Sequence, residues 1–117
     1  MIQKLFNFED RLVQFAGETI FFCKELPKDN IGKYYFDQML RSTGSSALNF
    51  GEAQGTNTVK DFIHKMTTVL KELKETKVSL KVLGYISYGD EAKRNMLLEE
   101  LGELTAIVSK MILNKKK

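Results

Sequence analysis

The chain has 117 residues, of which 43% are hydrophobic and 28% charged, and its net charge is +3 at pH 7. This length is typical of one domain, so we expect a single domain over residues 1–117. The lone cysteine excludes an intrachain disulfide and fits a cytoplasmic protein, and no window reaches the ~20 apolar residues that a membrane span needs.

The first predicted helix covers about residues 8–25. Asn7 is expected to cap it, because its side chain can accept hydrogen bonds from free backbone amides of the first turn. Glu9 and Asp10 suit the positive end of the helix dipole, and Pro27 ends the pattern because proline lacks a backbone N–H. Apolar residues recur between these ends at steps of three and four, which predicts one buried face.

The second predicted helix covers about residues 31–53, with Asn30 as the candidate cap. Residues 42–46 read Ser-Thr-Gly-Ser-Ser, a run with poor helix propensity that alone would suggest a loop. Apolar residues keep the helical spacing on both sides of this run, so we expect the helix to continue through it. Small side chains there would let a neighbouring helix approach closely.

The third predicted helix, about residues 58–83, contains no glycine or proline. Thr58 with Asp61 resembles a capping box, and Gly84 is the expected stop. Ser87 with Asp90 repeats this arrangement before a fourth helix, about residues 88–113. Connections of roughly three to five residues favour antiparallel neighbours. The sequence therefore predicts an all-α protein, an antiparallel up-down-up-down four-helix bundle.

The sequence contains no pattern typical of catalysis, metal binding or a cofactor. His64 is the only histidine, so zinc-binding and catalytic-triad spacings are missing. Glycines near the end of the second helix lack the Lys-Ser/Thr ending of a phosphate-binding loop. Cys23 lies in an apolar stretch, where we expect a buried hydrophobic side chain rather than a reactive thiol. We predict neither an enzyme nor a metal or cofactor site.

Four polar residues of the predicted helices are expected to have structural roles. Glu52 and Glu72 are candidates for salt bridges, since the Glu-x-x-His pairs of di-metal bundles are missing. Arg41 lies beside the apolar stripe of its helix and can pair with such a glutamate; ligand contact is the alternative. Asn49 is predicted to hydrogen-bond to another helix.

The third helix carries the best candidate for a partner-binding surface. At about 100° per residue, five lysines fall within an arc of roughly 120° beside the apolar stripe: Lys60, Lys71, Lys74, Lys77 and Lys81. Lysines arranged in this way can neutralise phosphates without reading bases. The alternative is an ordinary solvated helix face, which is favoured because the helix lacks interleaved aromatic residues for base stacking.

Several short segments, spread over nearly the whole chain, stand out together. They are Phe8-Glu9-Asp10, Leu26-Pro27, Gln38-Met39-Leu40-Arg41, Ala47 to Ala53, Asp61 to Met66, Leu70-Lys71-Glu72 and Leu83-Gly84-Tyr85-Ile86. This combination resembles the small four-helix-bundle proteins encoded in intervening sequences of bacterial 23S ribosomal RNA genes. Many members carry a second arginine where Leu40 stands, so a role that depends on an arginine pair is not carried over.

The resemblance implies a ring-like homopentamer without enzyme activity. A related branch, the accessory protein of diversity-generating retroelements, binds nucleic acid and a reverse transcriptase through a basic surface. By analogy, the five lysines are the residues expected to contact RNA or DNA. Two hypotheses follow: a non-catalytic protein that binds nucleic acid through a basic face, or an oligomeric protein-binding scaffold without nucleic-acid contact.

Overall fold

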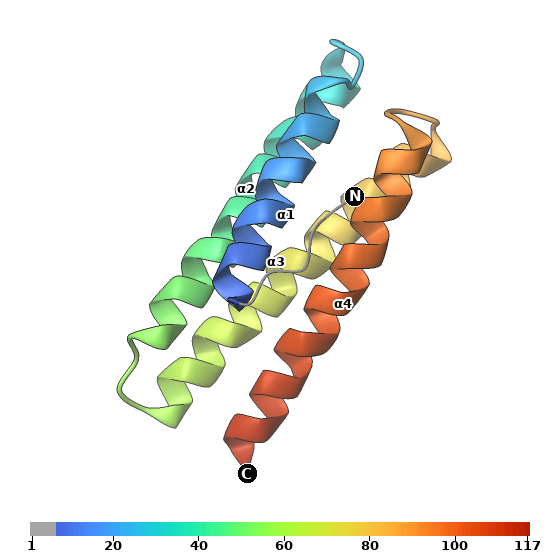
Figure 1. Ribbon diagram of the computed structural model, residues 1–117. Helices are drawn as coiled ribbons and strands as arrows, with labels where there is room; N and C mark the ends of the chain where they lie inside the picture. The colour runs from blue at the N-terminus through green and yellow to red at the C-terminus, as the bar shows by residue number, and fades with distance from the viewer. Residues whose placement is uncertain (1–6) are drawn as a thin grey trace.

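The computed structural model describes residues 7–117, which form four α-helices and no β-strand (Figure 1). Helix α1 spans Phe8–Lys24, α2 spans Asn30–Gln54, α3 spans Val59–Tyr85 and α4 spans Glu91–Lys116. The predicted all-α fold is confirmed by these four elements. The predicted single domain also includes residues 1–6, which lie outside the described residues.

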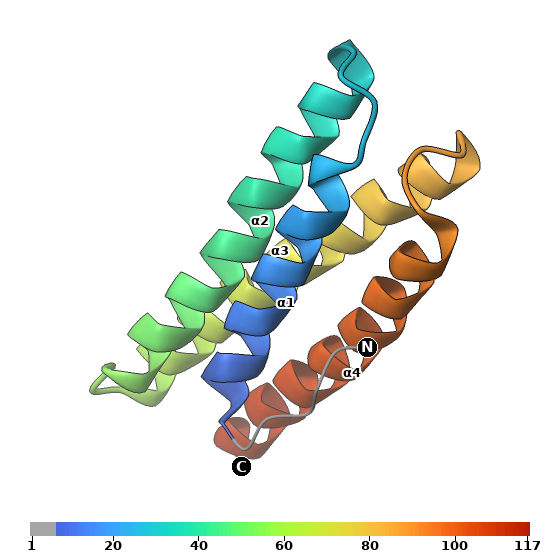
Figure 2. The same ribbon diagram turned by 45° about the horizontal axis from the view of Figure 1, so that its top comes forward.

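The helices lie along one long axis, in a bundle whose Cα atoms extend over 45 × 26 × 19 Å. Figures 1 and 2 show the chain running one way along α1 and α3 and the opposite way along α2 and α4. Among the helix pairs in contact, packing is most extensive between α2 and α3 and least extensive between α1 and α4. The α2–α3 pair is therefore the structural centre of the bundle.

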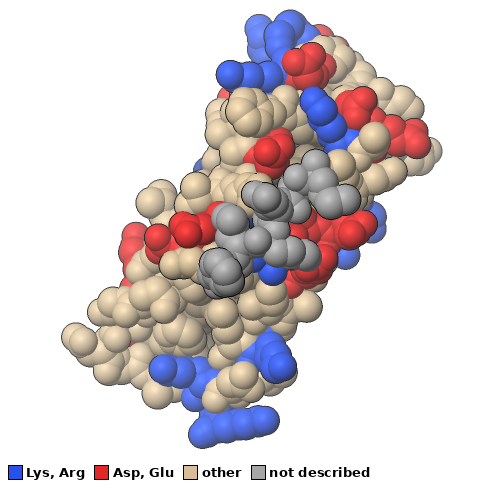
Figure 3. All heavy atoms as spheres, in the orientation of Figure 1, with Lys and Arg blue, Asp and Glu red and all other residues tan. Residues whose placement is uncertain are grey.

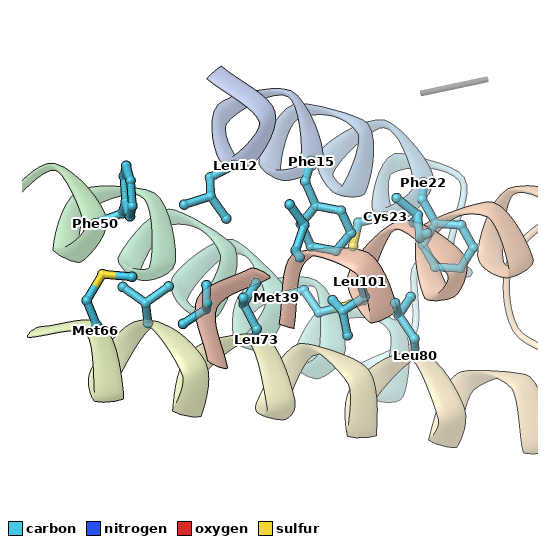
Figure 4. Close-up of a cluster of buried hydrophobic side chains, with 14 of the residues drawn as sticks. Leu12, Phe15, Phe22, Cys23, Met39, Phe50, Met66, Leu73, Leu80 and Leu101 are labelled. Atoms are coloured by element: carbon cyan, nitrogen blue, oxygen red, sulfur yellow. The ribbon is translucent and has the colours of Figure 1, made fainter. Parts of the chain in front are cut away.

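One hydrophobic core fills the space between the helices (Figure 4). Each helix contributes side chains that recur at helical spacing, and many of them have no exposed surface at all. The labelled members include Leu12, Phe15, Phe22 and Cys23 of α1, Met39 and Phe50 of α2, Met66, Leu73 and Leu80 of α3, and Leu101 of α4. Burial of this apolar surface is the main force that holds the four helices together.

The weak run in the middle of α2 is helical, as predicted. Ser42, Thr43 and Ser46 are buried there, and their hydroxyl groups find partners inside the bundle. Thr43 donates to the Met39 carbonyl at 2.6 Å, while Ser42 Oγ lies 2.6 Å from Thr76 Oγ1 of α3. Small side chains thus let α2 and α3 approach closely, and hydroxyl hydrogen bonds satisfy the buried polar atoms.

Two predicted helix starts are correct and one is wrong by a residue. The Asn7 side chain accepts hydrogen bonds from the first turn of α1, and Thr58 accepts from the Asp61 amide at 3.0 Å. Asp29, rather than Asn30, caps α2, and its carboxylate accepts from Gly32 N–H at 2.8 Å. Asp and Asn are comparable caps. The second carboxylate oxygen lies 2.5 Å from the Tyr88 hydroxyl, a contact from the distant α3–α4 turn.

The turn between α3 and α4 differs from the prediction. Helix α3 continues through Gly84 and ends at Tyr85. Two residues later, Ser87 adopts a left-handed φ of 61° and turns the chain away from the helix. Ser87 N–H donates to the Gly84 carbonyl and Tyr88 N–H to the Leu83 carbonyl, the two hydrogen bonds of a Schellman motif. Ser87 is therefore the C-terminal stop of α3 and not the predicted cap of α4.

The cap of α4 is Asp90, whose carboxylate accepts from Lys93 N–H at 2.8 Å. Gly84 has a different role from the one predicted. A Cβ atom at this position would lie 3.0 Å from Nε of Arg94, so glycine gives the buried arginine room to cross α3. Arg94 in turn donates to the Tyr88 carbonyl at 2.9 Å and fixes the connection.

Candidate nucleic-acid interface

The five predicted lysines all lie exposed on α3. The centre of the buried side of this helix is formed by residues such as Val69, Thr76 and Leu83. At about 100° per residue, the centre of the lysine arc lies roughly opposite that buried side. Within residues 7–117, no ion pair joins any of the five lysines to an acidic side chain. Their charges are therefore available at the outer face of α3.

The two glutamates of α3 are engaged by an arginine of α2. Nη1 of Arg41 lies 3.2 Å from both carboxylate oxygens of Glu72, and Nη2 lies 2.5 Å from Oε1 of Glu75. Glu72 is buried, whereas the Arg41 side chain is half exposed. The hydrogen bond from Arg41 holds the pKa of Glu75 below its usual value. Arg41 thus neutralises acidic charge that would otherwise oppose the lysines.

The remaining predicted polar residues, Asn49 and Glu52, lie near the C-terminal end of α2. Glu52 pairs with Lys65 of α3 at 2.6 Å; the Glu52 side chain is exposed and that of Lys65 is partly exposed. The prediction for Asn49 is wrong in its partner: Nδ2 donates to the carbonyl and the hydroxyl of Ser45, one turn back on the same helix. An Asn side chain is short enough to bond to its own helix, and this contact replaces the expected one between helices.

A groove of about 620 Å³ runs along the surface between α2 and α3. Lys71 and Lys74 line it from α3, and Tyr34, Tyr35 and Gln38 line it from α2. The prediction that aromatic residues are missing holds for the predicted helix, residues 58–83, but α3 continues to Tyr85, an exposed tyrosine one turn beyond Lys81. The neighbouring helix supplies two more aromatic residues. The adjacent tyrosines are visible in the sequence, whereas their position beside the lysines depends on the register between the helices.

Buried ion pairs elsewhere were not predicted from the sequence. Arg11 of α1 contacts Glu100 of α4 at 2.7 Å and Glu103 at 3.3 Å, and Arg11 and Glu100 are both buried. These contacts join the two neighbouring helices with the least extensive packing. Charged residues on a predicted apolar face, such as Glu100 between Leu97 and Leu101, are the signal that could have identified them.

The surface shown in Figure 3 carries basic and acidic side chains close together. Among residues 7–117 there is no cluster of three or more His, Cys, Asp or Glu side chains that could hold a metal ion. The Cys23 side chain lies in the core, and this burial raises the pKa of its thiol to about 12. None of the four helices combines the length and the hydropathy required to cross a bilayer.

Comparison with known proteins identifies the chain's relatives. Residues 8–110 match the family model for 23S rRNA-intervening sequence proteins. A crystal structure from Bacteroides thetaiotaomicron, of a protein with unknown function from the S23 ribosomal protein family, has a TM-score of 0.78 to this chain. It shares 26% sequence identity, over 90% of this chain and 94% of that one. A search of curated proteins found no match. The extent of the family match shows that this chain belongs to the 23S rRNA-intervening sequence proteins.

Proposed function

We propose that this protein is a non-catalytic nucleic-acid-binding protein that contacts RNA or DNA through the outer face of α3. The observation that carries the proposal is the exposed arc of Lys60, Lys71, Lys74, Lys77 and Lys81, without an ion pair to any acid in residues 7–117. Point charges of this kind bind phosphates and release counterions, which gives affinity with little sequence preference.

The arrangement of the acids on α3 supports this proposal. Glu72 and Glu75 lie on the side that faces α2, where Arg41 pairs with both. Asp61 lies in the first turn, where its charge suits the positive end of the helix dipole. A phosphate backbone that approaches the outer face of α3 therefore meets lysines rather than unpaired carboxylates.

The proposal predicts a strong salt dependence. If all five lysines neutralise phosphates, the slope of log K against log salt is about −3.5 for single strands and about −4.5 for duplexes. Filter binding of a structured RNA at several salt concentrations measures this slope. Absence of binding at low salt would defeat the proposal.

Two variants with the same net charge can separate the contribution of the α3 lysines to binding from the contribution of net charge alone. Lys71→Glu/Lys74→Glu places two negative charges on the outer face of α3 and should abolish most of the binding. The control, Lys93→Glu/Lys110→Glu, changes two exposed lysines of α4 and gives the same net charge, which falls by four from +3 to −1. The control should lose much less affinity, and equal losses would indicate that net charge alone is responsible.

A second candidate function is that of an oligomeric scaffold that binds protein and not nucleic acid. It is favoured by the apolar side chains exposed along α2 and α3, such as Tyr34 at 56% and Val78 at 60%. Surfaces of this kind are often covered by another chain. The family resemblance favours a homopentamer, which light scattering can test. The scaffold function predicts that charge reversal at Lys71 and Lys74 leaves partner binding unchanged.

A further inference from the structure

The groove between α2 and α3 contains an aromatic pair at its surface. The rings of Tyr34 and Tyr35 meet edge to face, with centroids 4.9 Å apart and an interplanar angle of 87°. Tyr35 is half-buried and packs against the core, whereas Tyr34 is exposed. Tyr35 therefore supports the Tyr34 ring at the surface of the groove, which lowers the entropy lost when a ligand stacks on it.

The groove combines apolar walls with positive charge. Leu70, Val78 and Val82 line it together with Lys71 and Lys74. The only acid among the lining residues is Glu75, whose charge is balanced by Arg41 at 2.5 Å. A matching ligand must therefore offer a flat apolar surface and negative charge within a few ångströms of each other. An unpaired nucleotide has both, in its base and its phosphate.

We propose that this groove binds unpaired nucleotides of a single-stranded nucleic acid, with a base stacked on Tyr34 and the adjoining phosphates on Lys71 and Lys74. This inference rests on the proposed nucleic-acid binding and specifies single strands, because paired bases in a duplex do not expose a face for stacking. The volume of about 620 Å³ lies within the range of small-ligand sites. The side-chain amide of Gln38, which also lines the groove, provides a donor and an acceptor for a base edge.

Fluorescence anisotropy with a labelled oligo-dT strand and a hairpin duplex of equal length tests the inference. The native protein should prefer the single strand, and Tyr34→Ala should weaken single-strand binding about 5- to 150-fold, the range for loss of one stacked base. Tyr34→Phe keeps the ring and should retain the affinity. Phe21→Ala is the matched control, because Phe21 of α1 is an aromatic residue about as exposed as Tyr34, 59% against 56%, but lies outside the groove lining.

The lysines remain in every tyrosine variant, so duplex binding and the salt slope should not change. If Tyr34→Ala leaves single-strand binding unchanged, or weakens strand and duplex equally, the stacking site is overturned while lysine-dependent binding stands. A protein partner in the groove would give the first of these results. A lower molecular mass of Tyr34→Ala in light scattering would show that a second copy covers the groove, which also overturns the inference. If the native protein binds neither probe at low salt, the proposed function itself fails.

Discussion

Replacing Ser42 and Thr76 singly and together would measure the hydrogen bond that joins α2 to α3 in the core. The two hydroxyl oxygens are 2.6 Å apart and both residues are buried. Thr76 Oγ1 also lies 3.0 Å from the Glu72 carbonyl, which can only accept, so the single hydroxyl hydrogen of Thr76 points there. Ser42 is therefore the donor and Thr76 the acceptor.

Because Ser42 is the donor, the two single substitutions should have unequal costs in the free energy of unfolding. Thr76→Val leaves the Ser42 O–H without its acceptor in a buried site, at a cost of about 1–3 kcal/mol in the free energy of unfolding. Ser42→Ala removes the donor but lets Thr76 keep its bond to Glu72, so its cost is about 1 kcal/mol. The double variant contains no orphaned donor. Its cost should fall below the sum of the single costs by about 0.5–1.5 kcal/mol.

Urea denaturation followed by far-UV circular dichroism gives the four free energies of the cycle. The control cycle combines Ser42→Ala with Thr19→Val, because Thr19 is equally buried but its hydroxyl bonds, within residues 7–117, only to the Phe15 carbonyl of its own helix, at 2.8 Å. That pair should be additive within about 0.5 kcal/mol. The same additivity for Ser42 and Thr76 would contradict the contact and the close approach of α2 and α3 that it requires.

Three further predictions concern helix ends and the core. Hydrogen bonds from Gly32 N–H and then Tyr88 lower the pKa of Asp29. The ionised carboxylate should therefore make the native protein more stable than Asp29→Asn above the usual Asp pKa of about 3.9, and this difference in unfolding free energy should shrink as pH falls through the lower folded-state pKa. A difference that does not change with pH would contradict this. Ser87→Val should lower stability by about 1–2 kcal/mol because its φ is 61°, whereas Ser87→Gly should not lower it, as urea denaturation of both variants can show. The buried Cys23 thiol, with its pKa raised to about 12, should react with a thiol reagent at mildly alkaline pH only after unfolding, and rapid modification of the folded protein would refute its place in the core.

The helices and their bundle could be predicted because the signals for them are local. Apolar spacing marks each buried face, and it identified α2 as continuous across the Ser-Thr-Gly-Ser-Ser run despite poor propensity. The ends were less certain where two capable residues are adjacent, as with Asp29 and Asn30. Gly84 was misassigned because its role depends on Arg94, which lies on another helix and cannot be placed from local sequence.

In the candidate site, too, the features that depend on one helix could be predicted from the sequence, whereas those that depend on two helices could not. The lysine arc follows from the period of one helix, so the sequence was sufficient to place all five lysines on one exposed face. The position of Tyr34 and Tyr35 beside Lys71 and Lys74 depends on how α2 and α3 are aligned, which no short-range pattern specifies. Asn49 shows the same limit, because its amide had two available partners and the nearer one, in its own helix, prevailed.

On α3, the residues that pack in the core and the residues proposed to bind nucleic acid lie on different sides of the helix. Residues that hold the bundle together, such as Leu83 and Thr76, lie on the buried side, and the lysines lie roughly opposite. Arg41 is the link between the two sides, because it pairs with the buried Glu72 and also balances the charge of Glu75 at the edge of the groove. Charge reversal at the lysines should therefore alter binding without unfolding the protein, whereas loss of Arg41 should disturb both properties together. That contrast between variants distinguishes a binding surface from a helix face that is only solvated.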